Sequence, residues 1–204
     1  MGIFAKKGNK MKQSSGNGQY AKVCLTFEPG ERDSGIAFES KIKGGVVPKE
    51  FIPSVEKGIK NAATYGPLGW PVVDFKATLT DGQYHAQDSS PYAFEIASNR
   101  ATRGAFEEIG TKLLEPIMDA EIRVPSKFVG HVLGDIAKRR GKVINMSQDV
   151  EEQIINAEVP LSETFGWITK LRSMTQGQGT CSLQFLKYEI VPDEIQKEIE
   201  NKWR

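Results

Sequence analysis

The order of apolar repeats in the second half of the chain limits the possible folds more than any other feature. From residue 116 onward, segments of period-two alternation and segments of helical periodicity follow one another as β-α-β-β-α-β. The six segments are, in order, "PIMDAEIRVP", "SKFVGHVLGDIAKRR", "KVINM", "QIINAEVP", "SETFGWITKLRSMTQG" and "GTCSLQFLKYEI". This order is that of the split βαβ motif, so we expect a ferredoxin-like domain here.

The first half of the chain predicts strands and helices in a different order. Strands are expected in "GQYAKVCLTFEP", "GIAFESKI" and "WPVVDFKATLTDG", the last of which ends in a turn at Asp81-Gly82. One helix is expected to open at Pro48. A longer one follows Ser90 and Pro91, which suit an N-cap and a first helical position.

Length and pattern together predict an α+β protein of two domains. The boundary is expected after residue 114, giving domains 1–114 and 115–204, the second with a last helix from Pro192 onward. No uninterrupted apolar run approaches the ~20 residues of a membrane span. Two distant cysteines, Cys24 and Cys181, fit a reducing compartment, so we expect a cytosolic protein.

The first 22 residues are basic, although the net charge of the whole chain is only +1. They contain no acid, and their charged residues are Lys6, Lys7, Lys10, Lys12 and Lys22. Composition leaves two interpretations open. One is a disordered, solvated tail, and the other is a basic arm that attracts nucleic acid phosphate.

The stretch "GQYHAQDSSPYAF", residues 82–94, raises the question of a catalytic His85. Ser89 and Ser90 follow on the same loop, whereas a catalytic serine usually meets its histidine from a distant segment. No G-x-S-x-G elbow is present. Asp88 and Ser90 have a sufficient structural role as caps of the following helix. We therefore expect no hydrolase site.

Metal and nucleotide sites are not expected either. The candidate ligands lie far apart in sequence without metal-site spacing, and they are Cys24, His85, His131 and Cys181. The glycine pattern "GNGQYA" precedes its strand, and "GAFEEIGTK" falls within a helical pattern, so neither suits a phosphate-binding loop. For "KRRGK", residues 138–142, complementation of a helix dipole is favoured over contact with RNA phosphate.

Several longer segments resemble one family. "KIKGGVVPKEFIPSVEKGIKNA" resembles the start of the first helix in domain IV of bacterial-type elongation factor G, and "WPVVDFKATLTDGQYHAQDSSPYAF" is similar to the sequence that follows it. Three segments of the second half resemble domain V of that family: "LLEPIMDAEIRVP", "VLGDIAKRRGKV" and "AEVPLSETFGWITKLRSMTQGQGTCSLQF". These motifs run in order from about Lys12 to the C-terminus, so the resemblance covers nearly the whole chain.

The resemblance implies an elongated α+β domain IV with a left-handed βαβ connection, followed by a ferredoxin-like domain V near the RNA of the large ribosomal subunit. It also implies a tip of two loops that enters the decoding region of the small subunit behind transfer RNA and messenger RNA, without covalent chemistry. The expected tip residues are Ser14, Ser15, Gly16, Asn17, Gly18, Gln19, His85, Gln87, Asp88 and Ser89. The lysines expected to attract phosphate are Lys10, Lys12 and Lys22.

The resemblance does not extend to the GTPase domain or to domains II and III of the family. We therefore expect no enzyme activity and no cofactor in this chain, because GTP and Mg²⁺ belong to that GTPase domain. Two interpretations stay open. The chain is either the C-terminal part of a translocase, or a stand-alone ribosome- or protein-interaction module, such as a recycling or ribosomal-protection paralogue. We expect a monomer without membrane contact, in the cytoplasm or, for an organellar factor, in the mitochondrial or plastid matrix.

The sequence departs from the family pattern at two places of interest. Pro91 and Tyr92 replace a glutamate and a methionine, and proline suits a first helical position. Gln178 replaces an arginine, which removes a charge from a possible RNA contact.

Overall fold

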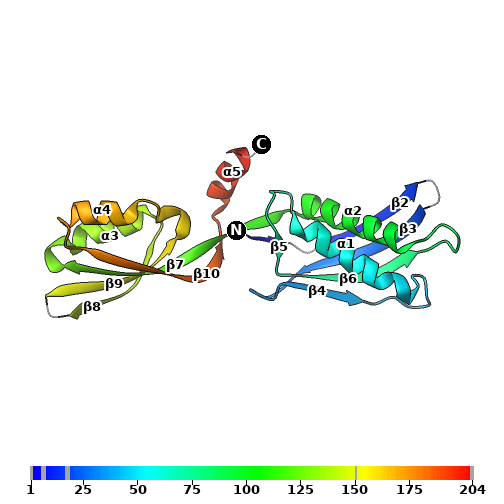
Figure 1. Ribbon diagram of the computed structural model, residues 1–204, viewed down its shortest axis with the longest axis horizontal. Coiled ribbons are helices and arrows are strands. Elements are labelled where there is room, and N and C mark those ends of the chain that lie inside the picture. Colours follow the sequence, from blue (N-terminus) through cyan, green and yellow to red (C-terminus); the bar gives the residue numbers. More distant parts are fainter. Residues whose placement is uncertain (1, 6–7, 17–18, 150, 203–204) are drawn as a thin grey trace. The chain divides into compact units, whose positions relative to one another are not determined.

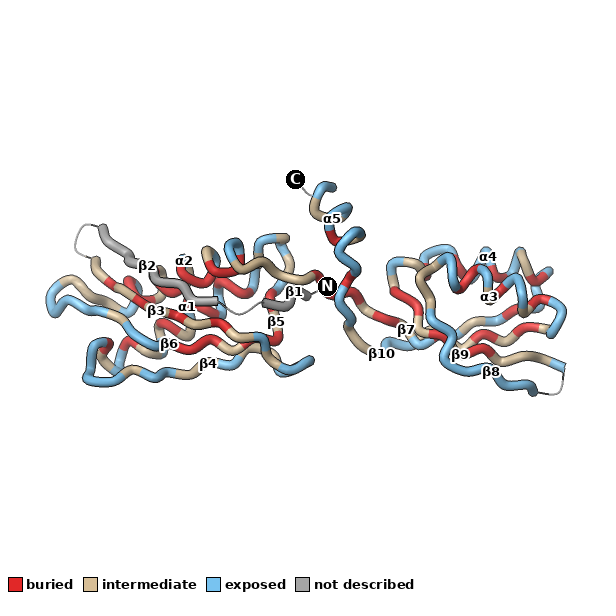
Figure 2. The backbone as a smooth tube through the Cα atoms, turned by 180° about the vertical axis from the view of Figure 1, so that it is seen from behind, coloured by how far each residue is buried: buried red, intermediate tan, exposed pale blue. Residues whose placement is uncertain are grey.

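The computed structural model describes residues 2–5, 8–16, 19–149 and 151–202, with side chains from residue 19 onward. Its contacts divide the chain into two compact units. Unit 1 comprises Met1–Leu113 and Val191–Arg204, and unit 2 comprises Leu114–Ile190. Each unit has a sheet and a hydrophobic core of its own, and Figure 2 shows the buried residues of each along its strands and inner helix faces.

Unit 1 contains a four-stranded sheet in the order β2-β3-β6-β4. Its strands are β2 (Gly8–Gly16), β3 (Gln19–Pro29), β4 (Ile36–Ser40) and β6 (Phe75–Gln83). β2 and β6 pair with β3 in antiparallel fashion, whereas β4 pairs with β6 in parallel. Since a helix lies between β4 and β6 in the chain, these elements form a βαβ unit.

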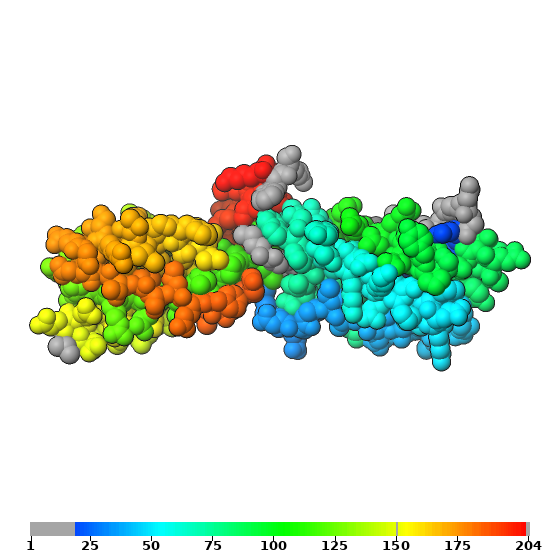
Figure 3. Space-filling view, in the orientation of Figure 1, coloured from blue at the N-terminus to red at the C-terminus, as the bar shows by residue number. Residues whose placement is uncertain are grey.

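Two helices cover one face of this sheet. They are α1 (Ile52–Thr64), which follows the short turn η1 (Lys49–Phe51), and α2 (Pro91–Ile109). Figure 1 shows both in front of the strands, and Figure 3 shows their atoms side by side in cyan and green. Alternate residues of β3 from Ala21 to Phe27 are fully buried beneath them. Phe27, Phe75 and Phe106 meet edge to face or tilted within this core.

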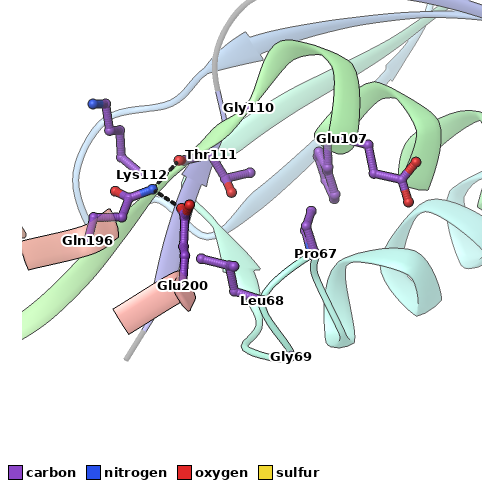
Figure 4. Close-up of a pocket in the computed structure, with 10 residues that line it drawn as sticks. Pro67, Leu68, Gly69, Glu107, Gly110, Thr111, Lys112, Gln196 and Glu200 are labelled. Atoms are coloured by element: carbon purple, nitrogen blue, oxygen red, sulfur yellow. Dashed lines mark hydrogen bonds between the residues drawn. The ribbon is translucent and has the colours of Figure 1, made fainter. Parts of the chain in front are cut away.

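The remaining elements of unit 1 lie at the end where the chain passes into unit 2. β1 (Gly2–Ala5) pairs in parallel with β5 (Val72–Val73). α5 (Asp193–Lys202) packs beside a hollow of about 790 Å³, where the Gln196 side chain donates to Thr111 O and to Glu200, as Figure 4 shows. The N–H of Leu113 donates to Gln196 Oε1 at 3.1 Å.

Unit 2 has the expected β-α-β-β-α-β order. Its strands are β7 (Thr111–Pro125, of which the first three residues belong to unit 1), β8 (Lys142–Asp149), β9 (Glu152–Pro160) and β10 (Thr180–Ile190). All pairs are antiparallel in the spatial order β10-β7-β9-β8. The helices are α3 (Val129–Lys138), after the turn η2 (Ser126–Phe128), and α4 (Trp167–Met174), after η3 (Leu161–Glu163). The predicted α+β class and the ferredoxin-like domain are therefore confirmed.

Several predicted boundaries differ from the structure. The turn expected at Asp81-Gly82 is wrong, because β6 continues through both residues to Gln83. The apolar repeat from Ala93 to Leu113 predicts a helix of about six turns after Ser90, but α2 ends at Ile109, where Gly110 takes a φ of 78° and lets the chain enter β7. The glycine-and-serine segment from Gly8 to Gly16 is a strand paired with β3 rather than a tail.

The helix ends of unit 2 also differ from the prediction. Ser126 suits an N-cap by residue type, and the sequence predicts that it caps the helix α3, but it makes no side-chain capping bond, because it opens the turn η2 rather than the α-helix. The helix expected from residue 162 begins only at Trp167, after Gly166 adopts a left-handed φ of 71°.

The last helix was expected with residues 115–204, and here the structure differs. Val191 is buried in the core of unit 1, and its N–H donates to Leu113 O at 2.9 Å. These contacts place Val191–Arg204 with unit 1. No helix in the described part of the chain is long and apolar enough to cross a membrane.

Candidate functional site

Two parts of unit 1 meet at one of its ends, and together with the end of β6 we call them the tip. One is the end of the paired strands β2 and β3, where Gly16 lies opposite Gln19, and the other is the loop from β6 to α2, residues 84–90. β3 and α2 start at this end, while β6 finishes there. α2 has 19 residues and so extends roughly 28 Å from the tip toward the opposite end, where the chain enters β7.

The Ser89 hydroxyl joins the 84–90 loop to the start of β3. It donates to the carbonyl oxygen of Tyr20 at 2.6 Å and accepts from the N–H of His85 at 2.9 Å. The backbone adds two further bonds, from Tyr20 N–H to Asp88 O at 2.7 Å and from Ser89 N–H to His85 O at 2.9 Å. The loop is therefore closed on itself and fastened to the first residues of β3.

His85 stands on the outside of this closed loop. Its Nδ1 lies 2.9 Å from Asp88 Oδ2, and the two side chains are 57% and 46% exposed. Ala86 and Gln87, between them, are exposed as well. The loop thus presents an imidazole, a carboxylate and an amide to solvent, all of which can form hydrogen bonds with a polar partner.

The start of α2 fixes where the loop ends. Ser90 Oγ accepts from the N–H of Ala93 at 3.1 Å, and Pro91 occupies the first turn, so both roles predicted from sequence are confirmed. Tyr92, which departs from the family pattern, is exposed on that first turn.

The expected tip residues fall into three groups. His85, Gln87 and Asp88 lie together on the 84–90 loop with exposed or half-exposed side chains. Ser89 lies on the same loop but faces inward, so its hydroxyl is used within the protein. Ser14, Ser15 and Gly16 end β2 opposite the first residues of β3, from Gln19 to Ala21.

The remaining expected residues lie on the strands or outside the description. Between the antiparallel strands β2 and β3, Lys10 lies opposite Leu25 and Lys12 lies opposite Val23. Lys22 on β3 is half-buried, and no described carboxylate forms an ion pair with it. The predictions for Asn17 and Gly18 fall outside the described residues.

The geometry does not support nucleophilic catalysis at His85. The Ser89 hydroxyl donates its hydrogen bond to the Tyr20 carbonyl oxygen, and the imidazole Nδ1 of His85 lies against Asp88 instead. A nucleophile must be within hydrogen-bond reach of its base, with a third group orienting that base. Among the described residues, no group of three or more His, Cys, Asp or Glu side chains could hold a metal ion.

Tyr20 and Gln83 belong to the tip but were not predicted from sequence. The Tyr20 hydroxyl donates to Gln83 Oε1 at 2.7 Å, across the antiparallel pair of β3 and β6. Their alternation with the buried residues of both strands could have suggested exposed polar positions. Their contact depends on strand register, which the sequence pattern alone did not supply.

The basic segment 138–142 in unit 2 proves to be an ion-pair network. Arg140 donates to both carboxylate oxygens of Glu115, at 2.7 and 2.9 Å, and these bonds raise the pKa of Arg140. Arg139 donates to Asp135 at 2.8 Å and to the Glu163 carbonyl, and lies over the Trp167 ring. Both arginines are therefore engaged within the protein, which agrees with the structural role that the sequence favoured over RNA contact. This role comes more from ion pairs than from interaction with the helix dipole.

Comparison with known proteins also divides the chain near residue 110, although the C-terminal match includes most of α5. The family model for elongation factor G, domain IV, matches residues 4–109, and the model for the elongation factor G C-terminus matches residues 112–199. An elongation factor G of Granulibacter bethesdensis is 48% identical over 192 residues, which are 94% of this chain and 28% of that protein. One of Paracoccus denitrificans is 48% identical over 193 residues, or 94% of this chain and 27% of that protein.

A solved structure is similar as well. A crystal structure of a protein from Thermus thermophilus matches with a TM-score of 0.81 and 35% identity, over 100% of this chain and 30% of that one. The chain thus spans less than a third of the length of these relatives. Because the two family models together match nearly all of its residues, the chain belongs to the elongation factor G family and carries that family's domain IV and C-terminal segments.

Proposed function

We propose that the chain acts as the ribosome-contacting part of an elongation factor G-type translocase. Its tip enters the decoding region of the small subunit, where it promotes movement of transfer RNA with messenger RNA and blocks their slippage back. The mechanism is steric and electrostatic, without covalent chemistry in this chain. GTP and Mg²⁺ play no part at the tip, because the resemblance assigns both to another domain of the family.

The observation that supports this proposal best is the closed loop around Ser89. A steric block must keep its shape under load, and four hydrogen bonds among Tyr20, His85, Asp88 and Ser89 hold this loop. The outward groups, His85 and Gln87, suit hydrogen bonds with RNA backbone and 2′-hydroxyls, which are read by shape. Lys10, Lys12 and Lys22 add an attraction to phosphate that falls with salt.

A site-specific photo-crosslinker at position 85, mixed with ribosomes at low salt, tests the proposal. We expect crosslinks to concentrate on RNA of the decoding region. The matched control is a crosslinker at Tyr65, which is also exposed but follows the far end of α1. Crosslinks from position 85 that are as scattered as those from position 65 would contradict the tip assignment.

Ribosome pelleting separates this function from a module that binds proteins only. Contacts with phosphate release counterions, so the fraction that pellets should fall steeply as salt rises. A fraction that pellets independently of salt, or none that pellets at any salt, would favour the protein-interaction module.

A further inference from the structure

A hollow of about 400 Å³ opens beside the tip, on the face of the four-stranded sheet opposite α1 and α2. Its floor is formed by paired positions of β3 and β6, Lys22 with Gln83 and Cys24 with Asp81. Val23 and Leu25, which alternate with these residues, point into the helix-covered core. Pockets that take small molecules have volumes of about 300–1,000 Å³.

A third loop, residues 41–47, contributes Val46 to the lining of the hollow. The N–H of Lys41 donates to Leu79 O at 2.8 Å, so this loop starts beside the middle of β6. Val47 is buried against Gly82, where an added Cβ would lie 2.4 Å from Val47 Cγ2 and 2.7 Å from Lys22 O. This close approach explains why residue 82, which the sequence predicted to lie in a turn, is a glycine within β6.

The two walls are apolar and accessible. Tyr84, on the 84–90 loop, is 43% exposed, and Val46, on the third loop, is 39% exposed. An aromatic ring and an aliphatic side chain on the rim of one hollow provide surfaces against which a planar ring can stack. Proteins bind single-stranded RNA in this way, by stacking bases on aromatic side chains beside a cationic groove.

The polar groups of the hollow can bind the polar edge of a base and a phosphate group. Among the described side chains, no acid forms an ion pair with Lys22, so its charge is available to an anion. Asp81 Oδ1 accepts from Gly82 N–H at 2.8 Å, which leaves its second oxygen able to accept from a ligand. Gln83 Oε1 is occupied by the Tyr20 hydroxyl, so its amide group is left to donate.

We propose that this hollow binds one unstacked base of the RNA that the tip contacts. The base stacks on Tyr84, Asp81 accepts from N–H donors on its edge, and Lys22 attracts a neighbouring phosphate. Guanine suits the hollow best, because its edge carries N–H donors for the second oxygen of Asp81 and a carbonyl oxygen that can accept from the Gln83 amide. The proposal rests on the proposed function and adds to it a recognition site for a single nucleotide.

Binding of short RNA to the full chain tests the proposal. The probe is a fluorescent hexanucleotide of uridines with one central guanosine, titrated at low salt and followed by anisotropy. Stacking is worth a factor of about ten per base, so Tyr84→Ala should weaken binding about tenfold. Tyr65→Ala is the matched control and should leave binding unchanged, since Tyr65 is exposed and lies at the other end of α1. Val46→Asp, at the other apolar lining residue, should also weaken binding.

Replacing the guanosine of the probe by 6-thioguanosine allows a zero-length crosslink. We expect it to map to residues 81–84 or 22–24. The proposal is overturned if the wild-type chain does not bind the probe, if Tyr84→Ala and Tyr65→Ala behave alike, or if the crosslinks lie elsewhere. Such a result, together with position-85 crosslinks on decoding-region RNA, would reject the hollow and keep the tip function. Probe binding that needs Tyr84, together with scattered ribosome crosslinks, would reject the tip function and keep the hollow.

Discussion

At the scale of single residues, Ser89 determines how the tip is held. From sequence it is one of two adjacent serines, and the family resemblance suggests an RNA contact. In the structure its hydroxyl bridges Tyr20 and His85, so Ser89 supports the loop, while His85 stays exposed on it. The two residues should therefore respond differently to the same substitution.

We predict that Ser89→Ala lowers the free energy of unfolding by about 1 kcal/mol, because it leaves a partly buried carbonyl and an N–H without their partner. His85→Ala should change it by less than about 0.5 kcal/mol, as is usual for an exposed side chain. Urea unfolding of both variants measures the difference. A large loss of stability in His85→Ala would mean that the imidazole supports the fold and would contradict its assignment as a contact residue.

At the scale of elements, α1 and α2 approach each other most closely at a glycine. A Cβ on Gly58 would lie 2.3 Å from the Glu95 carbonyl oxygen and 2.1 Å from Ser98 Oγ, and both atoms belong to α2. Lys57 and Asn61 reach across to the Glu95 carboxylate on the same side. The helices can cover the sheet as one layer only because position 58 has no side chain.

We predict that Gly58→Ala destabilises unit 1 by about 1–3 kcal/mol, because the helices must move apart to admit the methyl group. The matched control is Gly134→Ala in α3, where an added Cβ meets nothing within 4 Å. There the same substitution should stabilise by about 0.5–1 kcal/mol, since alanine favours helix. Thermal melts of the two variants should shift in opposite directions, and a shift in the same direction would refute the packing argument.

The C-terminal end of α3 is held by charge as well as by packing. Burial raises the pKa of Asp135, but hydrogen bonds from Arg139 and Lys170 outweigh it and leave the pKa of Asp135 below its ordinary value. A carboxylate whose pKa is lower in the folded state stabilises that state at any pH above its unfolded pKa of about 4. This stabilisation is lost as the pH falls through the lower, folded value.

We therefore predict that Asp135→Asn costs about 3 kcal/mol near pH 7, because it leaves two cations without their buried partner. The difference from the wild type should shrink as the pH falls below about 4 toward the lower pKa of the folded state, where the folded wild-type carboxylate takes up a proton. Asp119→Asn, at an exposed position of β7, is the control. Chemical unfolding at pH 7, 4 and 2 measures the effect, and parallel pH profiles for Asp135→Asn and the wild type would rule it out.

At the scale of the whole molecule, the chain returns to its first unit after completing the second. Val191 enters the core of unit 1, and Gln196 bonds to the backbone of Thr111 and Leu113. Lys112 and Asp193 add an ion pair beside them. The last helix thus supports the domain that carries the tip, although it follows the other domain in sequence.

Deleting residues 191–204 should therefore destabilise unit 1 by about 3 kcal/mol, from one lost apolar side chain and several hydrogen bonds. Amide hydrogen exchange should become faster in α2 and β6 and stay unchanged in β8 and β9. Gln196→Ala should accelerate hydrogen exchange less than the deletion does, but in the same elements, α2 and β6. Faster exchange confined to unit 2 would show that the helix belongs there instead.

The sequence by itself determined the α+β class, the ferredoxin-like order of unit 2 and the cap at Ser90, because apolar periodicity and capping chemistry act over a few neighbouring residues. The family followed from long motifs, and the comparisons confirmed it. Only the tertiary structure decided the inward turn of Ser89, the ion pairs of Arg139 and Arg140, and the return of the last helix to unit 1. Each of these depends on atoms brought together from distant parts of the chain, and a local pattern carries no information about such partners.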